Sequence, residues 1–132
     1  MIRFFRNWLP TMLTLAVVLY ATLWPDPVGA EESMIFPGAD KLIHAVMMGG
    51  LSSAVLFDRR RAGHKLTCGY IVIVAIVMVV FSALDEVLQS AMGLGRSLDV
   101  LDFLADVTGI AIASLTAPPV INRIFRKRKP LF

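Results

Sequence analysis

The feature that most constrains this chain is an unbroken run of nineteen uncharged residues from Leu66 to Leu84. A bilayer core about 30 Å thick needs roughly 17–25 apolar residues to be crossed by a helix. The run has that length, and the wider stretch 66–92 is the clearest membrane-spanning segment in the sequence. Apolar residues make up 57% of the 132 residues and charged residues only 17%, too little charge for a soluble domain of this length. The sequence therefore predicts an integral membrane protein.

Three further apolar stretches reach about the length of a membrane-spanning helix, and four spans leave no room for a separate catalytic domain outside the bilayer. Pro118 and Pro119 are expected to end the last span, because proline cannot donate the helical hydrogen bond. We therefore predict an all-α polytopic membrane protein, a four-transmembrane-helix bundle that forms one domain over residues 1–132. The predicted segments are spans at about 8–25, 40–57, 66–92 and 98–117, followed by a basic tail at 122–132.

Basic residues indicate how the spans are oriented. Eleven of the thirteen Lys and Arg residues lie before the first span, between the second and third, or after the fourth, which is one side of the membrane. That side is cytoplasmic by the positive-inside rule, so we predict a multi-pass protein of the plasma or inner membrane with both termini in the cytoplasm. In an alternative interpretation, residues 1–30 are a cleaved signal peptide, which leaves three spans in the same orientation.

The sequence disfavours nucleic-acid binding and excludes an intrachain disulfide. The formal charge is +3 and the pI about 9.4, but the basic residues flank spans instead of covering a folded face, so no nucleic-acid partner is expected. Cys68 is the only cysteine, so no intrachain disulfide can form.

Ionisable residues gather at the outer level of the predicted second, third and fourth spans. At the centre of a membrane helix each costs about 2.5–3.5 kcal/mol on insertion scales, so such residues often mark a functional site. Side chains three or four positions apart lie on the same face of a helix. Asp99, Asp102 and Asp106 are therefore predicted to form a row of carboxylates that leads into the membrane at the start of the last span. We predict an outward-facing ligand-binding pocket formed by Asp40, Lys41, His44, Glu86, Gln89, Arg96, Asp99, Asp102 and Asp106.

Small residues recur every four positions in the second and fourth spans, a pattern that lets two helix backbones approach closely. We therefore expect these two helices to contact each other along their small residues. The predicted packing positions are Gly49, Ala105, Gly109 and Ala113.

Several of the polar residues also have a purely structural explanation. Asp40 and Asp99 can cap helices, and Lys41 can extend to the lipid head groups. Asp102 and Asp106 lie up to two turns inside a span and need partners, yet acids outnumber cations at this level. Some of the acids must therefore be protonated, or a cation must enter the cluster.

Three motifs resemble the signature of the VanZ-like family over roughly residues 8–117. They are Asp40-Lys-x-x-His44, Glu86-x-x-Gln89 and Arg96-x-x-Asp99-x-x-Asp102-x-x-x-Asp106-x-x-Gly109. The family is named after a teicoplanin-resistance accessory protein, so the resemblance implies a small membrane protein of the cell envelope with a role in glycopeptide resistance. The family pattern has Asn at the position of Asp106, so this chain adds a carboxylate there.

Three functions are compatible with these residues. The first is a binding module for an envelope lipid head group, a lipid-linked cell-wall intermediate or a glycopeptide-like ligand, in which Lys41, His44 and Arg96 would contact anionic groups. The second is a membrane-embedded enzyme acting on a lipid-linked substrate, with His44 in acid–base chemistry. No nucleophile is evident, so no catalytic residue is assigned.

The third function is a structural scaffold, held together by interhelical polar contacts or by a metal ion. The candidate metal ligands are His44, Glu86, Asp102 and Asp106. A set rich in carboxylate oxygens favours Ca²⁺ or Mg²⁺ over structural zinc, which prefers Cys and His.

Overall fold

The computed structural model describes residues 1–23, 39–92 and 99–127, and within these ranges every regular element is a helix. The predicted all-α class is therefore confirmed. The helices are α1 (Ile2–Asn7), α2 (Leu9–Leu23), α3 (Ala39–Arg61), α4 (Cys68–Ala91) and α5 (Val100–Lys127).

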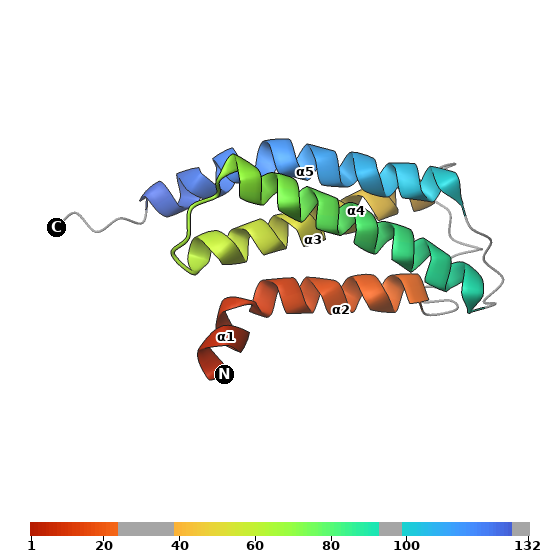
Figure 1. Ribbon diagram of the computed structural model, residues 1–132, viewed down its shortest axis with the longest axis horizontal. Coiled ribbons are helices and arrows are strands. Elements are labelled where there is room, and N and C mark those ends of the chain that lie inside the picture. The colour runs from red at the N-terminus through yellow and green to blue at the C-terminus, as the bar shows by residue number, and fades with distance from the viewer. Residues whose placement is uncertain (24–38, 93–98, 128–132) are drawn as a thin grey trace.

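The four longer helices alternate in direction along the chain (Figure 1). α3 contacts every other described helix, and its contact with α5 is the most extensive in the described structure. The basic end of the molecule is where α1 lies and where α3 and α5 finish; the last turns of these three helices all carry Arg or Lys. The polar end is the opposite one, where α3 and α5 begin and α4 finishes.

Two of the described helices, α4 and α5, are long and apolar enough to cross a membrane. α2 is apolar but has only 15 residues, and the 23 residues of α3 include charged side chains at both ends. The four-span arrangement therefore remains a prediction. The candidate cleavage site of a signal peptide, at residues 28–30, lies outside the described residues.

The end of α5 differs from the prediction. We expected Pro118 and Pro119 to end the helix, but α5 continues through both to Lys127 and takes in residues 122–127 of the predicted basic tail. Proline removes two intrahelical hydrogen bonds there. Packing keeps the segment helical, because Ile121 is buried in the apolar core and the Phe125 ring lies 5.4 Å from that of Phe57 on α3.

The contact between α3 and α5 is made backbone to backbone at small residues. A Cβ atom added to Gly109 on α5 would overlap the carbonyl group of Ala45 on α3. One added to Gly49 on α3 would lie 3.0 Å from the carbonyl oxygen of Gly109. The close approach that the small residues predict is therefore present, and it brings the polar side chains at the starts of both helices together.

The basic end contains a buried carboxylate that links two helices. Asp58, in the last turns of α3, has no exposed surface. Its Oδ2 accepts hydrogen bonds from the Thr11 N–H at 2.9 Å and from the Thr11 hydroxyl at 2.6 Å. Thr11 lies in the first turn of α2, where backbone N–H groups have no partner within the helix. Asp58 therefore caps α2 from another helix and places a negative charge at the positive end of its dipole.

Replacing Asp58 with alanine is expected to lower the free energy of unfolding by about 1.5–3 kcal/mol, the range for hydrogen bonds to a charged group. Denaturant titration in micelles, followed by circular dichroism, measures the change. Asp40→Ala is the matched control at the other end of α3, because its side chain is 43% exposed and its loss should cost much less. Equal stability of the two variants would contradict the capping role.

Candidate functional site

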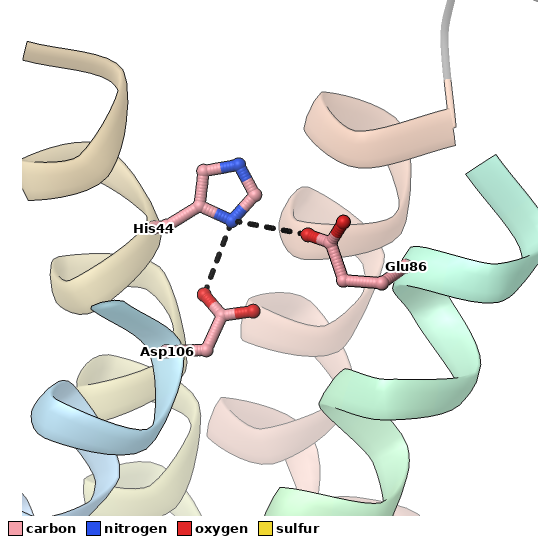
Figure 2. Close-up of side chains that lie close together, drawn as sticks. All are labelled: His44, Glu86 and Asp106. Carbon is pink, nitrogen blue, oxygen red and sulfur yellow. Dashed lines mark hydrogen bonds and ion pairs between the residues drawn. The ribbon is translucent and has the colours of Figure 1, made fainter. Parts of the chain in front are cut away.

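His44 lies at the centre of the polar side chains at the polar end of the molecule. Its ring projects from α3 toward α4 and α5 and is nearly buried. Nδ1 lies 3.1 Å from Oδ1 of Asp106 on α5 and 4.0 Å from Oε1 of Glu86 on α4 (Figure 2). The other ring nitrogen, Nε2, lies 3.8 Å from Oδ2 of Asp102. Side chains from three helices therefore meet at one imidazole.

Asp106 connects this histidine to a second buried residue of α4. The Ser82 hydroxyl donates a 2.6 Å hydrogen bond to Oδ2 of Asp106, while Oδ1 faces His44. Asp106 is only 1% exposed and Ser82 is completely buried. Both oxygens of the deepest carboxylate in the row therefore have partners, as a buried carboxylate requires.

Lys41 binds three carboxylates nearer the surface of the polar end. Its Nζ lies 3.0 Å from Asp102, 3.3 Å from Asp40 and 3.4 Å from Asp99. The Leu101 N–H donates a 2.9 Å hydrogen bond to Oδ1 of Asp99 at the start of α5. Asp99 thus caps α5, which is one of the structural roles considered for it in the sequence. Lys41 forms ion pairs with all three acids.

A neighbouring group of buried polar residues joins α2 to α4. Asp85 accepts hydrogen bonds from the Thr22 hydroxyl at 3.1 Å and from the Gln89 amide at 2.9 Å. All three side chains are at least 95% buried. Gln89 therefore supports Asp85, one turn before it on the same helix.

A small cavity lies beside the cluster, between α4 and α5. It has a volume of about 170 Å³, and its walls are mainly apolar, with Glu86 and Asp99 as the acidic residues. The complete lining is Ala83, Glu86, Val87, Asp99, Val100 and Phe103.

The structure brings together most of the residues that the sequence singled out. Asp40, Lys41, Asp99 and Asp102 form one ion-pair group, and His44, Glu86 and Asp106 form the deeper group next to it. Gln89 joins the Asp85 group instead. Arg96 lies outside the described residues.

Of the four metal ligands that the sequence suggested, three meet in the structure. One ligand atom each of His44, Glu86 and Asp106 lies within 4.8 Å of the other two. The fourth, Asp102, forms an ion pair with Lys41 and faces Nε2 of His44, whereas Glu86 and Asp106 face Nδ1. The described acids at this end outnumber Lys41 and His44, so the arrangement suits a ligand that brings positive charge or hydrogen-bond donors.

Sequence reasoning missed the contributions of Ser82 and of α2. No residue of the first span was among the predicted site residues, but the Thr22 hydroxyl donates to Asp85 and the Thr11 hydroxyl donates to Asp58. A usable signal was present, because Thr11, Thr14 and Thr22 recur at helical spacing and form a small polar face on an otherwise apolar helix.

Comparison with known proteins identifies the family of the chain. No curated protein and no solved structure matches the chain. The family described as VanZ/LLP1 matches residues 7–122, which include α2 to α4, nearly all of α5 and every polar residue discussed at the polar end. By this match over most of its length, the chain belongs to the VanZ-like family.

Proposed function

We propose that the chain crosses the cell membrane four times, with both termini in the cytoplasm and the polar end facing outward. The gathering of α1 and the last turns of α3 and α5 at one end supports this orientation, because all of them carry basic residues (Figure 1). The apolar surfaces of α4 and α5 suit contact with lipid tails.

In this orientation, we propose that the polar end binds the ammonium-bearing head group of an envelope lipid. The cavity between α4 and α5 carries the proposal, because its walls are almost entirely apolar and Asp99, whose side chain is 40% exposed, supplies a carboxylate at its edge. Such a combination suits an amphiphile whose apolar part lies against the walls and whose cationic group meets the Asp99 carboxylate. Lys41 already pairs with three acids, which disfavours recognition of an anionic head group by this residue.

Competition between two lipids tests this function. Native mass spectrometry of the protein with equal amounts of phosphatidylethanolamine and phosphatidylglycerol is expected to show about tenfold preference for the amine, the factor that one charge-assisted hydrogen bond supplies. Asp99→Asn should reduce the preference, and Ala83→Phe should abolish it by filling the cavity.

Leu84→Phe is the matched control for Ala83→Phe, because Leu84 is 63% exposed on the neighbouring position of the same helix. Equal retention of the two lipids by the wild type, or a preference that survives Ala83→Phe, would refute head-group binding in this cavity. Displacement of the amine lipid by a lipid-linked cell-wall intermediate or by teicoplanin would assign the cavity to that ligand instead, and displacement by teicoplanin would also support a role in glycopeptide resistance.

A further inference from the structure

We propose that His44, Glu86 and Asp106 together bind one divalent metal ion of the Zn²⁺ or Mn²⁺ class. Zn²⁺ binds histidine nitrogen and carboxylate oxygen at about 2.0–2.2 Å, so two ligands of a four-coordinate ion lie roughly 3.4 Å apart. Nδ1 of His44 and Oδ1 of Asp106 are separated by 3.1 Å, and Nδ1 and Oε1 of Glu86 by 4.0 Å. All three ligand atoms lie within 4.8 Å of one another, and metal binding would require the Glu86 oxygen to move closer to Nδ1.

Glu86 provides an independent indication of a ligand. Its side chain is 6% exposed and points from α4 toward the imidazole (Figure 2). Its Oε1 atom is buried and has no hydrogen-bond partner among the described residues. A buried carboxylate oxygen without a partner is costly, and a metal ion between Glu86 and His44 would remove that cost.

The residues around the three ligands match the usual surroundings of a metal site. Ligating carboxylates are commonly held by a hydrogen bond, and a ligating histidine commonly turns its second nitrogen toward a carboxylate. Here Ser82 donates to Oδ2 of Asp106 and leaves Oδ1 directed at the site. Nε2 of His44 faces Asp102, which Lys41 holds in place. The second nitrogen can thus carry the proton while Nδ1 binds the metal.

The imidazole decides the class of ion. Ca²⁺ and Mg²⁺ take oxygen ligands almost exclusively, whereas Zn²⁺ and other transition metals accept imidazole, and Mn²⁺ suits carboxylates. The sequence alone favoured Ca²⁺ or Mg²⁺ because carboxylates were numerous. In the structure only two carboxylates meet the imidazole, so a nitrogen atom would be one of three protein ligands. That share of nitrogen favours a transition metal.

The test uses the full-length protein in lipid-free detergent after treatment with a chelator. Titration with Zn²⁺, followed by elemental analysis, is expected to show one bound ion per chain. Mn²⁺ added to the metal-free protein should give a pulsed electron paramagnetic resonance signal that shows coupling to an imidazole nitrogen. His44→Gln should abolish that coupling, and Glu86→Gln and Asp106→Asn should each weaken Zn²⁺ binding at least about tenfold.

Asp85→Asn is the matched control, because it removes the carboxylate next to Glu86 on α4, which pairs with Thr22 and Gln89 instead of His44, and it should bind like the wild type. Absence of nitrogen coupling in the wild type would overturn the proposal, and this result needs no variant to fold. Equal competition by Mg²⁺ or Ca²⁺ for the site would also overturn it. Because no lipid is present, the outcome is independent of head-group binding, whose test uses the cavity residues Asp99 and Ala83.

Discussion

Replacing Asp106 with alanine is expected to lower the free energy of unfolding of the metal-free protein by about 3–5 kcal/mol, the range for a buried ionic pair that loses one partner. The carboxylate is 1% exposed and holds both His44 and Ser82. Removing it leaves an imidazole nitrogen and a hydroxyl buried without a partner. Denaturant titration in micelles, with circular dichroism as the readout, measures the loss.

Asp106→Asn separates hydrogen bonding from charge at the same position. The amide can accept from His44 through its oxygen and contact the Ser82 hydroxyl through its nitrogen, so it keeps the contacts and removes one negative charge from an acidic cluster. We expect the free energy of unfolding of this variant to lie within about 1 kcal/mol of the wild-type value. If the alanine variant proved as stable as the asparagine variant, the hydrogen bonds of Asp106 would not stabilise the fold.

The second large effect is expected at the contact between α3 and α5. Gly109→Ala places a methyl group against the carbonyl of Ala45, and a backbone cannot rotate away as a side chain can. Overpacking of this kind typically costs about 1–3 kcal/mol, because the helices must separate. The same shift should move Asp106 relative to His44, so weaker Zn²⁺ binding is expected together with the lower stability.

Gly50→Ala is the matched control for this substitution. A Cβ atom at Gly50 meets nothing within 4 Å, so alanine should be neutral or slightly stabilising through its helix propensity. Both variants are measured by the same denaturant titration. A Gly109 variant that unfolds at the same denaturant concentration as the Gly50 variant would show that the two helices can separate slightly at no cost.

Local sequence patterns predicted the helices well where they alone determine structure. The predicted spans 66–92 and 98–117 give both ends of α4 and the start of α5 to within about two residues. The end of α5 was wrong, because it depends on burial of Ile121 in a core formed by several helices. Burial of that kind has no signature in a single helix.

The candidate site was predictable in composition but not in its pairings. Residue spacing predicted that His44, Asp102 and Asp106 lie at one level of the membrane. It does not show that Lys41 forms an ion pair with Asp102 while His44 pairs with Asp106. Those partners depend on the depth at which α3 and α5 meet, which the Gly109 contact sets. The rotation of α4 about its axis likewise determines that Glu86 faces His44 and that its neighbour Asp85 faces α2 instead.

The capping of α2 by Asp58 has a consequence for how the protein is assembled during synthesis. The two partners, Thr11 and Asp58, are 47 residues apart, and the helix that is capped is made first. Until the end of α3 has been translated, the first turn of α2 lacks this acceptor for the Thr11 N–H. The N-terminal hairpin should therefore close only after the ribosome has passed residue 58, and arrested nascent chains on either side of that point should differ in protease protection of α2.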